Sequence, residues 1–146
     1  MGNGKLDLKK IILIAVTVTI SSFVARYAFD EVGKMSAMFD KHLVTAASQI
    51  NQNLPIMVDS ETQFDVVIPL PRKKIQYVYT LINYSIDDID VEELANAVEP
   101  DLLNNIRTNS ALADFRNNKV TMIYCYKDKD GKELFTKEYT YDDYKK

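Results

Sequence analysis

The feature that most constrains this chain is an uncharged apolar run near its N-terminus. Residues 11–25 read IILIAVTVTISSFVA and contain no Asp, Glu, Lys or Arg. As a helix, this run covers roughly 22 Å of a hydrocarbon core about 30 Å thick. Continuing the helix through residues 26–29 brings it to roughly 28 Å, because Arg26 can extend its guanidinium to the headgroups. We therefore predict a single transmembrane anchor over residues 11–29.

The residues that flank the run bear on orientation and processing. Three lysines lie within residues 1–10, which favours a cytoplasmic tail there by the positive-inside rule. A cleaved signal peptide is the alternative, because such peptides also begin with a basic and then an apolar segment. Cleavage after Ala25 would leave Phe23, and cleavage after Ala28 would leave Arg26, at a position that requires a small residue. The sequence therefore favours an uncleaved anchor.

Small residues recur at every fourth position of the predicted span, at Thr17, Ser21 and Ala25. They share one helix face, and this spacing lets two membrane helices approach closely. Alternatively, the hydroxyls bond the carbonyl one turn back and need no partner. The first alternative makes these three residues a helix–helix interface in a homo-oligomer or a larger membrane complex.

An amphipathic helical stalk is predicted over residues 30–54, after the span. Its apolar residues repeat at steps of three and four: Val32, Met35, Phe39, Leu43, Ala46 or Ala47, and Ile50. Charged and polar residues fill the opposite face. Such a helix should either lie on the chain's own domain or pair with another chain.

The remaining residues, 55–146, predict a small α+β domain. Alternation of apolar residues over 62–68 and the β-branched and aromatic run over 75–84 predict a hairpin. A helix is expected over 91–106, with Pro100 breaking or restarting it.

A further helical piece is expected over residues 110–115, followed by strands at 120–127 and 133–141. The last two strands are joined at Asp128-Lys129-Asp130-Gly131, where glycine supplies the positive φ of a hairpin turn. The expected order is therefore α-β-β-α-β-β, with an antiparallel sheet.

Three segments of this domain resemble a family of small, uncharacterised bacterial proteins that are membrane-anchored or exported. They are LPIMVDSETQFD at 54–65, YVYTLINY at 77–84 and YCYKDKDG at 124–131. The resemblance covers about residues 54–142. It implies bacterial origin and an extracytoplasmic domain, and it brings no known activity. Together with the predicted anchor, this makes the expected location the bacterial inner membrane, with the C-terminal domain in the periplasm or outside the cell. Members of the family often carry a cysteine pair suited to a disulfide, whereas this chain has Cys125 alone.

The charge of the domain argues against a nucleic-acid partner. Residues 55–146 carry twelve Lys and Arg against seventeen Asp and Glu, a net of −5. Binding to phosphate backbones needs a concentrated basic surface.

No catalytic, cofactor or metal site is predicted. His42 is the single histidine and has no Cys at ligand spacing, so a solvated helix residue is expected. Cys125 falls in the middle of a strand and is expected to be a packed or edge thiol; a cross-link between two copies is the alternative. The loop at Asp128 lacks both end ligands of an EF-hand.

The acidic stretch Asp87, Asp88, Asp90, Glu92 and Glu93 suggests a calcium site. Its position favours a different role, because aspartates there can cap the following helix and glutamates in a first turn suit the helix dipole.

Tyrosines concentrate in the predicted strands, where they can pack beneath the helix that starts near residue 91 or form a binding surface. Phe39, Leu43, Tyr77 and Tyr79 are the candidates for an interaction surface. An interaction or assembly module, non-catalytic and held at the membrane, is therefore the favoured function. A binding protein for a small extracytoplasmic ligand, peptide or glycan is the alternative.

The predicted topology can be tested with reporters fused after residue 54. An enzyme that is active only outside the cytoplasm should be active in this fusion, because the lysine-rich tail is predicted to stay inside. A matched reporter that works only in the cytoplasm should be inactive at the same junction. The reverse pattern of activities would show that the topology is wrong.

Overall fold

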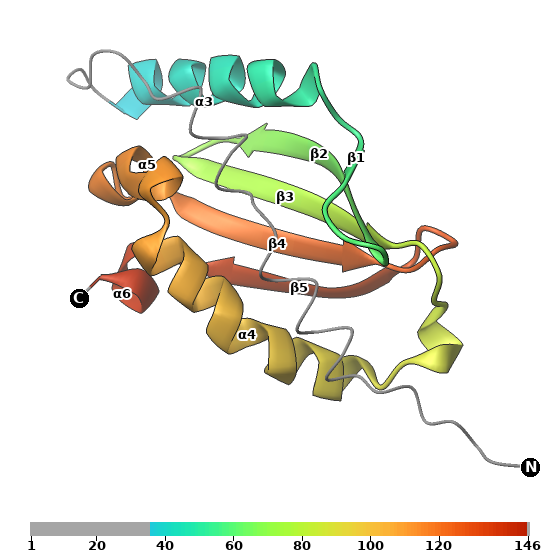
Figure 1. Ribbon diagram of the computed structural model, residues 1–146. Coiled ribbons are helices and arrows are strands. Elements are labelled where there is room, and N and C mark those ends of the chain that lie inside the picture. The colour runs from blue at the N-terminus through green and yellow to red at the C-terminus, as the bar shows by residue number, and fades with distance from the viewer. Residues whose placement is uncertain (1–35, 146) are drawn as a thin grey trace, which may run out of the picture.

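The computed structural model describes residues 36–145, which form a mixed α+β domain (Figure 1). The predicted anchor and its Thr17, Ser21 and Ala25 lie outside the described residues. Within 36–145, no helix is both long and apolar enough to cross a membrane. The elements are α3 (Ser36–Asn51), β1 (Ile56–Met57), β2 (Thr62–Leu70), β3 (Lys74–Leu81), η2 (Ile86–Asp88), α4 (Val91–Thr108), η3 (Ser110–Leu112), α5 (Ala113–Asn117), β4 (Thr121–Lys127), β5 (Glu133–Tyr139) and α6 (Tyr141–Tyr144).

The five strands form one sheet in the order β1-β2-β3-β4-β5. Neighbouring strands are antiparallel except β3 and β4, which are parallel. The expectation of an antiparallel sheet was therefore wrong at this central pair. The two hairpins are joined by α4, η3 and α5. These helices return the chain to the end of the sheet where β3 begins, so that β4 starts beside the start of β3. Such a crossover makes the strands that it joins parallel.

The helix after the first hairpin runs without a break from Val91 to Thr108, with Pro100 inside it. The prediction that Pro100 breaks the helix was wrong. Pro100 is exposed, and so is Asn96, whose carbonyl loses its usual backbone donor to the proline ring. Water can satisfy that carbonyl, so the helix tolerates proline on its outer face.

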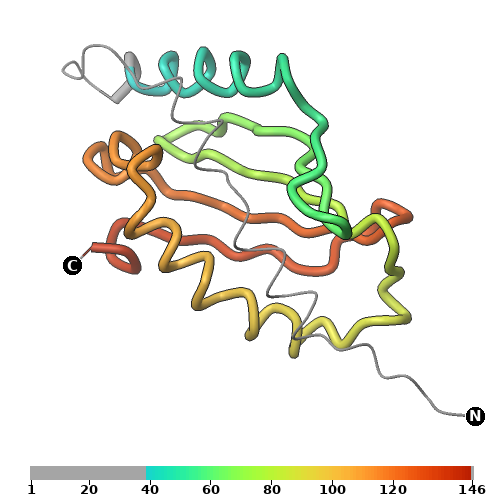
Figure 2. The backbone as a smooth tube through the Cα atoms, in the orientation of Figure 1, coloured from blue at the N-terminus to red at the C-terminus, as the bar shows by residue number. Residues whose placement is uncertain are grey.

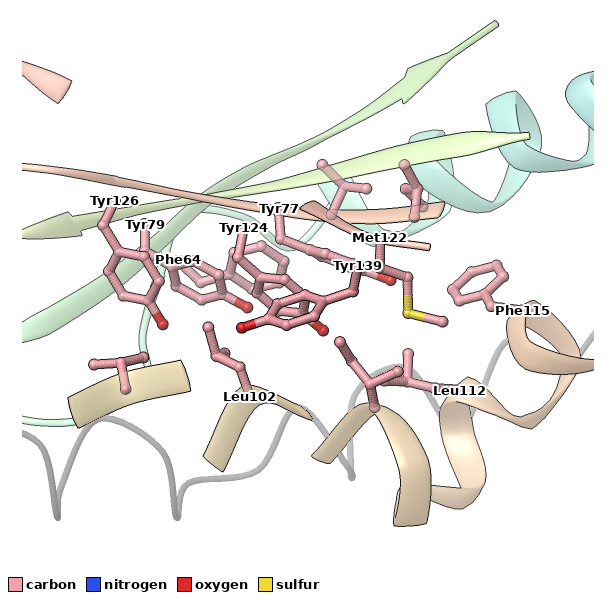
Figure 3. Close-up of a cluster of buried hydrophobic side chains, with 14 of the residues drawn as sticks. Phe64, Tyr77, Tyr79, Leu102, Leu112, Phe115, Met122, Tyr124, Tyr126 and Tyr139 are labelled. Carbon is pink, nitrogen blue, oxygen red and sulfur yellow. The ribbon is translucent and has the colours of Figure 1, made fainter. Parts of the chain in front are cut away.

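One buried cluster joins α3 and α4 to the same row of strand side chains. Aromatic rings stack across the strands, with centroids 4.8 Å apart for Phe64 and Tyr79 and 5.1 Å apart for Tyr77 and Tyr124. Figure 3 shows Leu102 of α4 facing these rings. Burial raises the pKa of Tyr77 and Tyr124, so both hydroxyls stay neutral.

Helix α3 is part of this domain, because its apolar stripe faces β2. Leu43, Ala47 and Ile50 are almost fully buried. The stalk was predicted either to lie on the chain's own domain or to pair with another chain. Its residues 36–51, which form α3, lie on the chain's own domain.

Two polar side chains fix α3 to the first hairpin. The Asn51 side chain bonds both backbone groups of Val67, with its Nδ2 donating at 2.8 Å and its Oδ1 accepting at 2.7 Å. It thereby takes the place of a strand along the edge of β2. The Asp40 carboxylate accepts from the backbone N–H groups of Arg72 and Lys73, both of which have positive φ. A left-handed conformation is unfavourable for such residues, and Asp40 stabilises it.

The turn of the second hairpin is organised by Asp128, which is fully buried. Its carboxylate accepts from the backbone N–H groups of Ile86, Asp130 and Lys132 at 2.8–3.0 Å. Desolvation acts to raise the pKa of Asp128, but these three donors outweigh it and hold the pKa below its ordinary value of 3.8. The ionised carboxylate therefore ties β4, β5 and the loop before α4 together.

The packing of α3 can be tested with two neighbouring substitutions in the full-length chain. Leu43→Ala should lower the free energy of unfolding by about 2–5 kcal/mol, because it empties a buried site. Val44→Ala is the matched control, since Val44 is 56% exposed, and should change stability by less than about 0.5 kcal/mol. Urea unfolding followed by circular dichroism measures both values. Equal effects would mean that α3 does not pack against the sheet.

The role of Asp128 predicts a dependence of stability on pH. Asp128→Asn should lower the midpoint of thermal unfolding at neutral pH, because an amide offers only one acceptor oxygen to three donors. The wild-type advantage should be full above the ordinary pKa of 3.8 and should disappear as the pH falls from there through the lower folded-state pKa. Asp130→Asn, in the exposed part of the same turn, is the control and should leave the midpoint nearly unchanged at every pH. A difference that persists at low pH would contradict this role.

Candidate functional site

The structure places most of the predicted interaction residues inside the core. Leu43 and Tyr77 are 0% exposed and Tyr79 is 3% exposed, so another molecule cannot reach them without displacing a helix. Phe39 is partly buried at the start of α3, with the Lys73 ammonium 5.5 Å from its ring centroid. The tyrosines thus pack beneath the helices.

The acidic residues before α4 and the cysteine, which the sequence analysis also considered, each contact neighbouring groups of the fold. Asp90 caps α4, because its carboxylate accepts from the Glu93 N–H at 3.0 Å. Asp88 accepts from Ser85 in the preceding turn. Cys125 is 2% exposed in β4, and its sulfur lies 3.9 Å from a Glu133 carboxylate oxygen. Among residues 36–145, no three Asp, Glu, His or Cys side chains are grouped so that they could hold a metal ion.

A pocket at one end of the sheet is the candidate site. The C-terminal end of α4, α5 and α6 gather there (Figure 2). The pocket has a volume of about 590 Å³. None of the lining residues is acidic: Pro100, Asn104, Arg107, Thr108, Arg116, Asn117, Lys119, Tyr141, Tyr144 and Lys145.

Arg116 lines this basic pocket and also bonds the C-terminal end of α4. One of its terminal nitrogens, Nη1, donates to the Ile106 carbonyl at 2.7 Å and to the Asn109 carbonyl at 2.6 Å. The last carbonyls of a helix lack backbone donors and carry partial negative charge. Arg116 supplies a donor to one such carbonyl, that of Ile106 in the last turn of α4, whereas the Asn109 carbonyl just beyond the helix also accepts from the Leu112 N–H at 3.1 Å.

Arg107 links α4 to α6. Its Nη2 donates to the Asp143 carbonyl at 2.7 Å, whereas its Nε is buried and has no hydrogen-bond partner among the described residues. The buried Tyr144 hydroxyl donates to the Val120 carbonyl at 2.8 Å and holds α6 against the start of β4. Burial, with a contribution from Tyr141, raises the pKa of Tyr144 to about 12.

Two lysines flank the ring of Tyr141 at the pocket mouth. The Lys119 ammonium lies 5.0 Å from the ring centroid and the Lys145 ammonium 5.7 Å from it. Lys145 also pairs with Asp142, and this hydrogen bond and charge raise the pKa of Lys145. Arg107, Arg116 and Lys119 form no ion pair within the described part of the chain.

Sequence reasoning missed this pocket. Its cations are scattered between residues 107 and 145, in a domain whose net charge is negative. The sequence held one signal for a basic site: Arg107, Arg116 and Lys119 lie within thirteen residues of one another, near the end of α4. The sequence does not show that Lys145 lies beside them, because this depends on how the crossover from β3 to β4 folds.

The sheet with its crossover helix defines the class of this domain, a mixed α+β fold. Residues 38–135 match the family described as a domain of unknown function, DUF8479. This match spans more than half of the chain, which therefore belongs to that family. No curated protein matches the chain in sequence.

Three solved structures share the fold. A Pseudomonas aeruginosa protein assigned as secreted has a TM-score of 0.66 at 9% identity and covers 79% of this chain and 100% of its own. The Vibrio vulnificus type 2 secretion system pilotin EpsS has a TM-score of 0.59 at 8% identity, with coverages of 76% and 96%. The Vibrio cholerae type II secretion system pilotin AspS has a TM-score of 0.55 at 9% identity, with coverages of 74% and 94%.

Proposed function

We propose that this chain is an accessory module that binds another protein of an assembly outside the cytoplasm, and that it has no catalytic role of its own. The observation that carries the proposal is the shared fold with two pilotins, whose chains are matched over 96% and 94% of their length. Both are pilotins of type II secretion systems. The protein assigned as secreted supports a location outside the cytoplasm.

The chemistry of the basic pocket supports binding rather than proton transfer. A general acid or base works best when its pKa lies near the working pH. Tyr144 has a pKa of about 12 and stays neutral, while the raised pKa of Lys145 keeps that residue charged. The pocket therefore offers fixed positive charge and hydrogen-bond donors.

The predicted anchor over residues 11–29 completes this proposal. Six residues, 30–35, lie between the predicted anchor and Ser36, the first described residue, and six residues span at most roughly 20 Å in any conformation. An inner-membrane anchor in that position would hold the domain close to the membrane surface. Partners in a membrane complex would then meet it at a high local concentration.

Binding of a small anionic ligand is the second candidate function. The pocket volume of about 590 Å³ lies in the range of small-molecule sites, and its lining is cationic. In this case the domain would act as a ligand-binding protein.

Cross-linking in intact cells tests the assembly proposal. The full-length chain, tagged at its C-terminus and expressed in its own host, should shift with increasing cross-linker dose to a discrete heteromeric species. Mass spectrometry should find a second protein in it at fixed stoichiometry. A chain lacking residues 1–29 is the control and should lose most of this species, because it loses its local concentration at the membrane. A chain that remains monomeric at every dose would rule the assembly proposal out.

A further inference from the structure

We propose that the basic pocket binds an acidic segment of the partner polypeptide, through Arg107, Lys119 and Lys145. This inference rests on the proposed function, whose partner it describes by chemistry. The pocket brings together cations from α4, from the loop after α5 and from the C-terminal residues that follow α6, and no carboxylate lines it.

Unused donor capacity is the first argument. The Nη1 of Arg116 is bonded at the end of α4, whereas Arg107 donates through Nη2 to a backbone carbonyl and pairs with no carboxylate among the described residues. The Lys119 ammonium lies over the face of the Tyr141 ring and forms no ion pair among the described residues. It can therefore still donate hydrogen bonds to a carboxylate.

The identity of the other lining groups favours a peptide over a compact phosphate. The pocket volume of about 590 Å³ lies in the range of sites for drug-sized ligands, which is more space than one phosphate group fills. The amides of Asn104 and Asn117 also line the pocket and can donate to and accept from a peptide backbone. Pro100 and the half-exposed ring of Tyr141 offer apolar contact to side chains between the acidic ones.

The charge of the remaining domain sharpens this preference. Residues 55–146 have a net charge of −5, so an acidic segment is repelled from most of the surface and attracted at this pocket. Electrostatic complementarity of this kind gives register and specificity.

Direct binding measurements test the proposal with the full-length chain in a non-ionic detergent. The probes are a labelled Glu-Ser repeat peptide and its Gln-Ser counterpart, followed by fluorescence anisotropy. The Glu peptide should bind more tightly than the Gln peptide, and its affinity should fall with added salt. Lys119→Met should weaken binding roughly three- to fivefold and Lys119→Glu roughly tenfold, because the second change also adds repulsion.

Lys41→Glu is the matched control, because it makes the same change of charge at an exposed position of α3. It should leave the affinity for the Glu peptide nearly unchanged. Equal weakening by Lys41→Glu and Lys119→Glu, or equal binding of the two peptides, would overturn the proposal. Inorganic phosphate that binds more tightly than the peptide, with the same sensitivity to Lys119, would also overturn it in favour of a phosphate ligand.

The cross-linked species separates this inference from the proposed function. If wild-type chain forms the heteromer and Lys119→Glu forms it equally well, the pocket is not the binding site although the function stands. If the wild-type chain forms no heteromer while the Glu peptide binds with the expected pattern of variants, the pocket binds acidic peptides and the proposed function is wrong.

Discussion

The parallel pairing of β3 with β4 is the constraint on which the rest of this structure depends. It places Tyr77 beside Tyr124 and Tyr79 beside Tyr126, so that one face of the sheet becomes a continuous aromatic surface. It also requires a long crossover between the two strands. The helix α4 supplies that crossover and covers part of the aromatic surface, and the end of α4 then determines where a pocket can form.

The aromatic surface explains why tyrosines that look available in the sequence are not available in the fold. Tyr77, Tyr79, Tyr124 and Tyr126 stack across the central strands, and all four are almost fully buried. Tyrosine suits a sheet that is covered only in part by any one helix, because its ring is large and apolar. These four tyrosines therefore serve in packing.

The elements could be predicted from the sequence wherever a local signal existed. Gly131 marked the second hairpin, and Asp90 marked the start of α4 through its capping position. The parallel pair could not be predicted, because two hairpins in succession do not specify how they join. The edge contact of Asn51 with Val67 was also hidden, since it joins a helix end to a strand sixteen residues later.

The pocket could not be predicted either, because its residues come together only through the crossover between the two hairpins. The last carbonyls of α4 need donors, and Arg116 of α5 supplies one to the Ile106 carbonyl. That requirement alone accounts for one cation. Lys119 and Lys145 have no such structural task, and their contacts are with an exposed ring and with Asp142 at the surface. Cations gathered beyond the needs of the fold, in a domain with a net negative charge, give the pocket electrostatic complementarity to an acidic partner.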